Sequence, residues 1–163
     1  MVKFITDDTL RTLTQQAQQS PRLRMNHNLH AEMEDPVQRL CNAMEPGTYV
    51  RPHRHAQRWE CLCILSGTAL LLIFDDDGQV VERVELSARG PVRALEMPAN
   101  TWHTLAGLES GTVLFEVKQG PYIKPEEKDF AAWAPAEGDI NAARLHEWFL
   151  QANVGSRPPA MPQ

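Results

Sequence analysis

Three histidines and a glutamate are the residues of this sequence best suited to chemistry. His53 and His55 are two residues apart, and Glu60 follows five residues later at the start of an apolar run. In an extended strand alternate side chains share a face, so both imidazoles are expected to point the same way. Two imidazoles and a carboxylate on adjacent strands could bind a divalent transition metal, and His103 is the candidate for a fourth ligand.

The predicted cofactor is one divalent transition metal ion. Three imidazoles and one carboxylate suit zinc, iron, nickel, manganese or cobalt, and the ligand types do not identify which of these metals is bound. A closed four-ligand zinc shell would be structural, whereas octahedral coordination by the same residues would leave two positions for substrate or water. The alternative is that the histidines bind no metal, since His-x-His on a strand often occurs by chance.

A strand with one entirely polar face is expected before the candidate metal ligands. Alternate residues from 22 to 30 are polar, with Leu23, Met25 and Leu29 between them. This face is either a solvated edge or the wall of a ligand cavity, where arginines would bind a carboxylate or phosphate and amides would bind hydroxyls. The candidates for that wall are Arg22, Arg24, Asn26, Asn28 and His30.

Four further residues are candidates for the same cavity. Tyr49 and Arg51 have the same parity as the first histidine, and Lys118 and Tyr122 follow the polar end of a predicted strand. Simpler interpretations are a solvated Arg51, a surface Lys118 and a packed Tyr122. No catalytic residue is assigned, and Tyr49 and His30 are only candidates for a general base.

Two amphipathic helices are predicted, one near each end of the sequence. Leu10, Leu13 and Ala17 have helical spacing and predict a helix over 7–19, and a second is predicted over 139–151. Between them, at least eight short strands separated by turns every eight to twelve residues indicate an all-β sandwich or barrel.

The chain is expected to form one domain. Its length is sufficient for a hydrophobic core, and the sequence has no internal repeat. We expect the domain over residues 1–155 and the barrel over about 22–122. The proline-rich segment 156–163 is predicted to be disordered.

Two further motifs are assigned to structure. Cys61 and Cys63 alternate with apolar residues after Glu60, so they should face away from the metal and serve in packing rather than in ligation or redox chemistry. Asp75–Gly78 is predicted to be a hairpin turn, because the remaining ligand spacing of a calcium loop is absent.

The residue spacing around the histidines resembles the first motif of the cupin family. In that motif a glycine, five residues, His-x-His, four residues, a glutamate, six residues and a second glycine follow each other. Gly47, His53, His55, Glu60 and Gly67 match every spacing. The resemblance implies an all-β cupin fold, a double-stranded β-helix or jelly-roll barrel, with short α-helices flanking it at both ends.

The second cupin motif is matched in part. Pro98 and His103 fit its pattern, whereas Asn100 stands where glycine is usual and Gly107 where asparagine is usual. The upstream Gly90 is two residues too far from Pro98, which predicts a slightly longer hairpin. None of these departures affects a predicted metal ligand.

The flanking segments resemble the WbuC-type cupin-fold metalloproteins. The segments concerned are Ser20–His30, Val37–Arg39, Phe115–Tyr122 and Asp129–Pro135. The resemblance covers roughly residues 5–137. It implies a role in polysaccharide biosynthesis of the O-antigen type and specifies no reaction.

The composition argues against several classes of partner. The net charge of −5 gives no electrostatic footprint for nucleic acid or an anionic membrane. The longest apolar run, Ala69–Phe74, is too short to span a bilayer, and the first residues lack the apolar core of a signal peptide. We therefore expect a cytoplasmic protein, consistent with three cysteines. A homodimer is expected, because cupins often pair through sheet edges and the face of Cys61 and Cys63 is apolar.

Three functions are compatible with these residues. The first is an enzyme acting on a small polar molecule, such as a sugar or sugar-nucleotide, by metal-assisted isomerisation or epimerisation, or with iron by dioxygen activation. The second is a module that binds such a ligand without turnover. The third is a structural metalloprotein, and whether the chain is an enzyme stays open.

Overall fold

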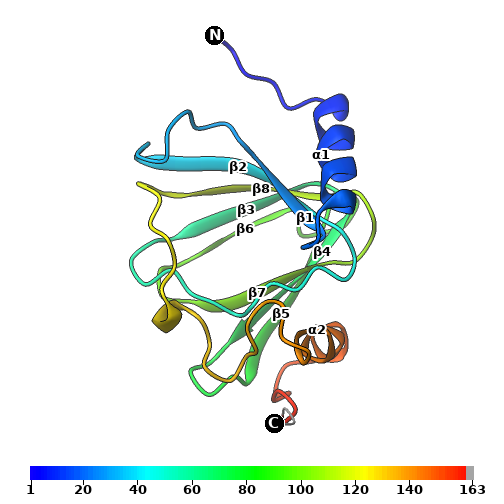
Figure 1. Cartoon of the computed structure of the whole chain (residues 1–163), viewed down its shortest axis with the longest axis vertical. Helices are drawn as coiled ribbons and strands as arrows, with labels where there is room; N and C mark the ends of the chain where they lie inside the picture. The colour runs from blue at the N-terminus through cyan, green and yellow to red at the C-terminus, as the bar shows by residue number, and fades with distance from the viewer. Residues whose placement is uncertain (161–163) are drawn as a thin grey trace.

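The computed structural model describes residues 1–160, within which lie two α-helices and eight strands (Figure 1). In chain order the elements are α1 (Asp7–Gln19), β1 (Arg24–Asn28), β2 (Val37–Met44), β3 (Glu60–Ser66), β4 (Thr68–Phe74), β5 (Val80–Ser87), β6 (Ala94–Met97), β7 (Trp102–Gly107), β8 (Thr112–Gln119), the 3-10 turn η1 (Glu127–Asp129) and α2 (Ala142–Gln151).

The strands form two antiparallel sheets that face each other as a jelly-roll barrel (Figure 1). The five-stranded sheet has the order β1-β2-β8-β3-β6, and the three-stranded sheet has the order β5-β4-β7. β3 and β4 are consecutive in sequence but belong to different sheets, and Gly67 turns the chain between them with φ of +71°. A Cβ at Gly67 would lie 2.7 Å from the Cα of Thr112, so this turn requires glycine for two reasons.

The inner core fills one part of the space between the sheets. β4 contributes to it through Ala69 and Leu71, which pack with residues such as Leu62 of β3. The alternate residues Leu70 and Leu72 face outward and are also buried. The continuous apolar run of β4 is therefore explained by burial on both of its faces.

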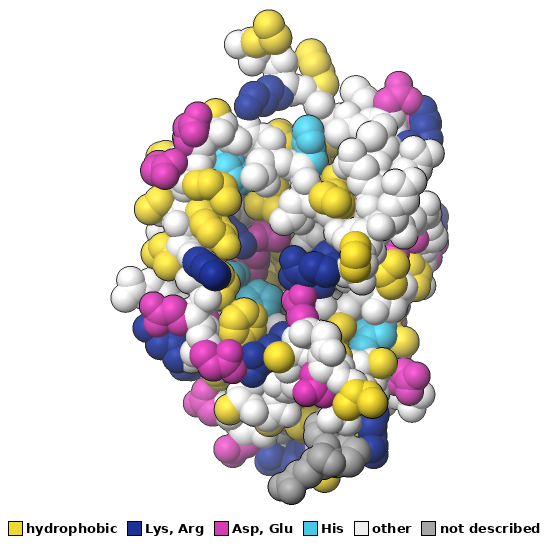
Figure 2. Space-filling model, viewed as in Figure 1, with side chains coloured by type: hydrophobic (Ala, Val, Ile, Leu, Met, Phe, Trp, Pro, Cys, Tyr) yellow, Lys and Arg dark blue, Asp and Glu magenta, His cyan; other side chains and the backbone are white. Residues whose placement is uncertain are grey.

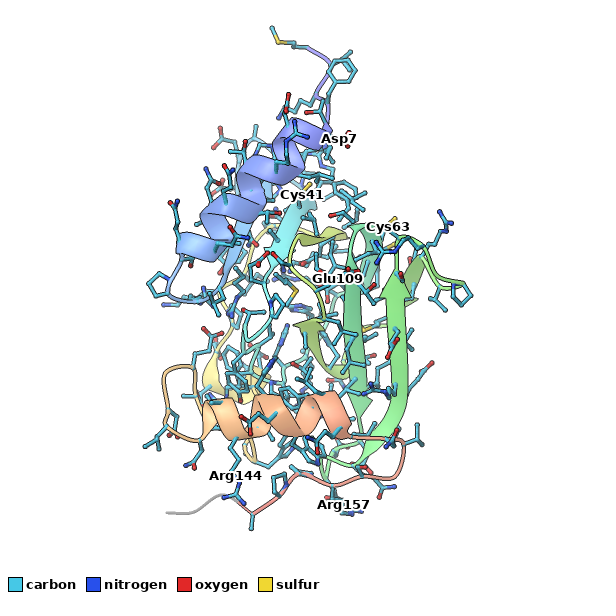
Figure 3. All side chains as sticks on the ribbon, turned by 90° about the vertical axis from the view of Figure 1, so that its right-hand side faces the viewer. Asp7, Cys41, Cys63, Glu109, Arg144 and Arg157 are labelled. Atoms are coloured by element: carbon cyan, nitrogen blue, oxygen red, sulfur yellow. The ribbon has the colours of Figure 1, made fainter. Side chains whose placement is uncertain are left out.

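Each helix covers the outer face of a different sheet (Figures 1 and 3). α1 packs Leu13 and Ala17 against Cys41 of β2 and its neighbours in the five-stranded sheet. α2 packs Leu145 and Phe149 against the outward residues of the three-stranded sheet. Both helices therefore lie outside the barrel and leave the space between the sheets open.

The helix boundaries follow local capping chemistry. α1 occupies the predicted range, and the Oγ1 of Thr6 accepts a hydrogen bond from the Thr9 amide (3.2 Å) at its start. α2 begins at Ala142, three residues later than predicted, because Gly138 has φ of +86° and Asp139 forms a turn. No helix within residues 1–160 has the length and apolarity needed to cross a membrane.

Part of the segment predicted to be disordered is fixed against the barrel. The carbonyl of Ser156 accepts a hydrogen bond from the Val80 amide (2.9 Å), and Arg157 donates to the side chain of Gln79 (2.8 Å). Ser156 thus pairs with the first residue of β5, and the side chain of Arg157 contacts the residue before it. Residues 161–163, the end of that predicted tail, lie outside the described range.

The cysteines point away from the space between the sheets, as predicted. Cys61 and Cys63 are half-buried on the outer face of β3, whereas Leu62 and Ile64 point into the inner core. Cys41 is buried beneath α1 (Figure 3). All three cysteines are free thiols.

Candidate metal centre and ligand cavity

A cavity of about 370 Å³ opens between the two sheets. Figure 2 shows it as a hollow with histidine and acidic side chains inside and basic side chains at its margin. The volume lies in the range typical of small-molecule sites. The predicted residues that line it are Arg22, Arg24, Asn26, Asn28, His30, Arg51, His53, His55, Glu60, His103, Lys118 and Tyr122.

His53 and His103 are held side by side by their own backbones. The amide of each donates to the carbonyl of the other, at 3.0 Å and 2.9 Å, so the loop bearing His53 lies along β7. Their ring centroids are 4.4 Å apart, and that of His55 is 5.2 Å from His53. Two residues far apart in sequence are thus fixed at one point of the barrel.

Hydrogen bonds at Nδ1 orient two of the three imidazoles. Nδ1 of His53 lies 3.0 Å from the carbonyl of Arg51, and Nδ1 of His103 lies 2.9 Å from the carbonyl of Thr101. A carbonyl can only accept, so Nδ1 carries the proton and Nε2 presents a lone pair. Ligand atoms of His53, His55 and His103 lie within 4.8 Å of one another.

Glu60 completes this cluster from the opposite sheet. Its carboxylate is 4% exposed, with Oε2 3.1 Å from Nε2 of His103 and 3.6 Å from Nε2 of His55. Neither Glu60 Oε2 nor His55 Nε2 has a hydrogen-bond partner within residues 1–160. Buried polar atoms without partners are costly, and a divalent cation would satisfy both. The residues therefore fit a metal held by three imidazoles and one carboxylate.

The protonation states of His53, His55 and Glu60 favour cation binding, whereas contact with Glu60 outweighs burial and raises the pKa of His103. Burial lowers the pKa of His53 well below its ordinary value and that of His55 to about 4, so both rings stay neutral near pH 7. Burial alone would raise the pKa of Glu60, but its contacts with His103 and Lys118 hold that pKa well below the usual range. Neutral imidazoles and an ionised carboxylate are the forms that bind metals.

A second carboxylate, Glu116, lies next to this cluster. It is 6% exposed on β8, and the Nζ of Lys118 forms an ion pair with it and lies 3.6 Å from Oε1 of Glu60. Burial and repulsion from Glu60 raise the pKa of Glu116 to about 7. Lys118 thus faces the cavity and bridges two carboxylates, rather than lying on the surface.

The polar residues of β1 and the segments on either side of it line the cavity wall. The side chains from Arg22 to His30 at alternate positions all face it, although Leu23 interrupts the strand geometry with φ of +53°. Tyr122 is 44% exposed and lies at the margin. Arg51 lines the cavity too, but its guanidinium is bound by Glu127 (2.8 Å) and by the carbonyl of Ala134 (3.0 Å).

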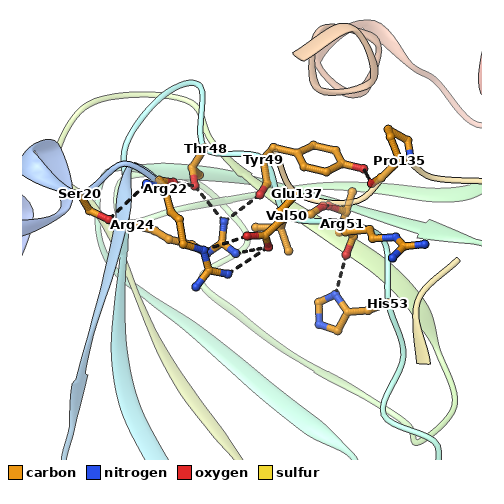
Figure 4. A network of polar contacts seen from close by, with 11 residues as sticks. Ser20, Arg22, Arg24, Thr48, Tyr49, Val50, Arg51, His53, Pro135 and Glu137 are labelled. Atoms are coloured by element: carbon orange, nitrogen blue, oxygen red, sulfur yellow. Dashed lines mark hydrogen bonds and ion pairs between the residues drawn. The ribbon is translucent and has the colours of Figure 1, made fainter. Parts of the chain in front are cut away.

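Tyr49 lies outside the cavity, and the prediction that it faces the ligand is wrong. Residues 49–52 form no strand, so the parity argument does not hold there. The hydroxyl of Tyr49 donates to the carbonyl of Pro135 (2.8 Å; Figure 4), and its ring stacks on Phe149 of α2. Burial raises the pKa of Tyr49, which also argues against its use as a general base.

Two groups on the cavity wall lack hydrogen-bond partners. Nδ1 of His30 lies 3.0 Å from both the amide nitrogen and the carbonyl oxygen of Arg39. This buried Nε2 and the Oδ1 of Asn42 have no partner in the described part of the chain. The wall therefore offers two unpaired polar atoms to a ligand.

The sequence interpretation missed Asn42, Glu116 and Glu137 as cavity residues. Glu116 could have been found, since it is two residues from Lys118 on the same strand and must share its face. Asn42 lies opposite Asn26 in the register of β1 and β2, which no local pattern reveals. Glu137 reaches the cavity from a loop, where periodicity gives no signal.

Comparisons with known proteins support the fold. KdgF from Halomonas sp. is 18% identical, with a TM-score of 0.50 covering 64% of this chain and 84% of that chain. A conserved protein of unknown function from Streptococcus pyogenes is 16% identical, with a TM-score of 0.50. The alignment covers 76% of this chain and 91% of that chain. A cupin superfamily protein from Desulfitobacterium hafniense is 20% identical, with a TM-score of 0.47. The alignment covers 59% of this chain and 76% of that chain. At such identities these likenesses concern the fold alone.

The sequence itself matches one family. No curated protein matches it significantly. The matching family profile is described as a domain of unknown function (DUF6016) and aligns with residues 5–86, half of the chain. The assignment to the WbuC type stays a prediction. The fold is a jelly-roll barrel like that of KdgF from Halomonas sp., and the chain belongs to the DUF6016 domain family.

Proposed function

We propose that this protein is a metal-dependent cupin that acts on or binds a small polar molecule. The ligand class we favour is a sugar or sugar-nucleotide, and the resemblance to WbuC-type proteins favours a role in O-antigen-type polysaccharide biosynthesis. The observation that carries the proposal is a cavity whose interior holds a metal-ligand set and whose wall holds unpartnered hydrogen-bonding groups.

The wall is suited to hydroxyl groups. A hydroxyl both donates and accepts, and so could pair with Nε2 of His30 and with Oδ1 of Asn42. Asn26 and Asn28 add amide groups on the same wall. Leaving such buried groups unpaired costs about 1–3 kcal/mol each, so a ligand that satisfies them would be selected over an apolar one of equal size.

The metal-ligand set supports a chemical role at one end of the ligand. A divalent ion bound there would supply Lewis-acid polarisation of ligand oxygens, which acidifies a C–H beside a carbonyl. The chain's own residues would orient the ligand through the amide-rich wall, and the Lys118–Glu116 pair lies close enough to Glu60 to influence charge at the site.

Elemental analysis of protein purified without a histidine tag tests this proposal first. We expect near-stoichiometric metal in the natural protein and none in a His53→Ala/His55→Ala double variant. His27→Ala is the matched control, because His27 is exposed on β1 and does not line the cavity. Metal retained by the double variant, or absent from all three proteins, would refute the metal centre.

Turnover is tested separately with the metal-loaded protein. A small panel of keto-sugars and sugar-nucleotides would be incubated in deuterated water and followed by NMR. Exchange of a C–H beside a carbonyl would indicate isomerase-type chemistry, and binding without exchange would indicate a binding module. Stoichiometric iron would instead direct the assays to oxygen consumption, as an iron-dependent dioxygenase requires. Failure to bind any of these compounds would count against the sugar assignment.

We also propose a homodimer. The half-buried Cys61 and Cys63 lie on the outer face of β3, away from the part of the sheet covered by α1. A second copy could cover this face. A monomeric mass in light scattering at micromolar concentration would refute the dimer.

A further inference from the structure

A polar cluster separate from the metal ligands lies at the margin of the cavity (Figure 4). The carboxylate of Glu137 is bound by two arginines at once. Nε and Nη2 of Arg22 donate to it at 2.8 Å and 3.0 Å, and Nη2 of Arg24 donates to the same carboxylate. Two guanidinium groups thus converge on one anionic group that lines the ligand cavity.

Arg24 is fixed independently of this carboxylate. Its Nη1 donates to the carbonyl of Tyr49 (2.8 Å), and its side chain is only 13% exposed. The backbone of Arg22 is held as well, because its carbonyl accepts a hydrogen bond from the Oγ1 of Thr48 (2.6 Å). Arg24 therefore keeps its position whether or not Glu137 is bound. Together with Arg22, whose side chain is 61% exposed, it forms a site for an anion that is preformed at Arg24.

Glu137 is the partner that lies outside the regular strands and helices. It belongs to the irregular segment between η1 and α2, whereas Arg24 is part of a strand. Its side chain is 35% exposed, and Gly138, with φ of +86°, follows it directly. A rotation of this exposed side chain would free both guanidinium groups without breaking any strand pairing.

The charge balance of the cavity also favours an anionic ligand. Of the charged residues lining it, Arg51 is already paired with Glu127. The remaining three cations, Arg22, Arg24 and Lys118, face the three carboxylates Glu60, Glu116 and Glu137. A divalent ion would add two positive charges to this balanced set, in a chain whose net charge is −5. Electrostatic attraction would then draw an anion to the cavity.

We propose that Arg22 and Arg24 form an anion subsite for a ligand carboxylate or phosphate, and that Glu137 occupies this subsite in the ligand-free protein. The inference rests on the proposed function and narrows its ligand to an anionic sugar derivative. Glu137 acts as an internal competitor for the two arginines. The apparent affinity for an anion therefore equals the intrinsic affinity multiplied by the fraction of protein in which Glu137 has left the arginines free.

Calorimetric titration of metal-loaded protein with inorganic phosphate and with acetate tests the proposal. If Glu137 holds the arginines about 90–99% of the time, Glu137→Gln should raise the anion affinity about 10- to 100-fold. Adding Arg24→Gln to that variant should remove the gain. Glu127→Gln is the matched control, because it removes a neighbouring carboxylate that pairs with Arg51 instead. The preferred anion distinguishes a phosphate from a carboxylate ligand.

Two results would overturn the inference. One is equal anion affinity in the natural protein and Glu137→Gln, and the other is an equal gain in Glu127→Gln, which would indicate a general charge effect. Anion bound directly at the metal would contribute equally to all variants and so would not imitate the expected pattern. Metal content measured on the same samples separates the two proposals: metal loss refutes the proposed function, whereas retained metal without the affinity change refutes only the anion subsite.

Discussion

Replacement of Glu116 by glutamine should stabilise the metal-free protein at alkaline pH. Glu116 lies on β8 opposite Leu62, faces the cavity and is 6% exposed. Its pKa is raised from 4.5 to about 7 by burial and by repulsion from Glu60, although Lys118 partly offsets both effects. The folded chain therefore binds a proton at Glu116 more readily than the unfolded chain does.

The size of the effect follows from this difference in pKa. A tenfold difference in proton affinity corresponds to about 1.4 kcal/mol, so ionised Glu116 costs the folded protein about 3 kcal/mol above pH 7. Below pH 4.5 both states are protonated and the cost disappears. Glutamine resembles the protonated form and leaves Lys118 in place. We therefore expect Glu116→Gln to raise the free energy of unfolding by about 3 kcal/mol at pH 8 and by less than about 1 kcal/mol at pH 5.

Urea unfolding of chelator-treated protein at both pH values measures this difference. Glu82→Gln, at an exposed position of β5, is the control and should show no such pH dependence. An unfolding free energy at pH 8 that is unchanged or lower in Glu116→Gln would refute the reasoning. In metal-loaded protein the added positive charge should lower the pKa of Glu116, so the gain at pH 8 should shrink.

Two further predictions concern the framework around the site. A Cβ at Gly107 would lie 2.3 Å from the carbonyl oxygen of Met44, so Gly107→Ala should cost about 1–3 kcal/mol in urea unfolding, whereas Gly111→Asn, which has open space around it, should cost less. Burial lowers the pKa of His146, so the unfolded chain takes up a proton first and stability falls as the pH drops below 6.5. His146→Gln should therefore lose less stability than the natural protein between pH 7.5 and 5; an equal loss would contradict this.

The clustering of the candidate metal ligands was predictable because it depends on local spacing. His53 and His55 are separated by one residue, and Glu60 begins the next strand, so their side chains converge wherever the two segments are adjacent. The second cupin motif supplied His103 despite Gly107 in place of the usual asparagine. The structure explains this substitution, because β2 approaches Gly107 too closely for any side chain.

The rest of the cavity depends on contacts that no local pattern contains. Tyr49 was misplaced because parity predicts a direction only within a strand, and its segment is irregular. Asn42 faces the cavity through the register of β1 and β2, and Glu137 reaches it from a loop more than 100 residues from its arginine partners. Such positions are determined by tertiary packing, which sequence periodicity does not describe.

The candidate metal ligands come from both sheets of the barrel. Glu60 begins β3 in the five-stranded sheet, and His103 lies on β7 in the three-stranded sheet, with His53 bound to its backbone. A metal held by these residues would cross-link the two sheets, so its removal should destabilise the barrel whether or not the protein is an enzyme. A metal-dependent melting temperature is therefore expected under all three functions. Only effects that require a ligand, such as exchange with solvent deuterium or anion binding at Arg24, distinguish a catalytic or binding cupin from a structural one.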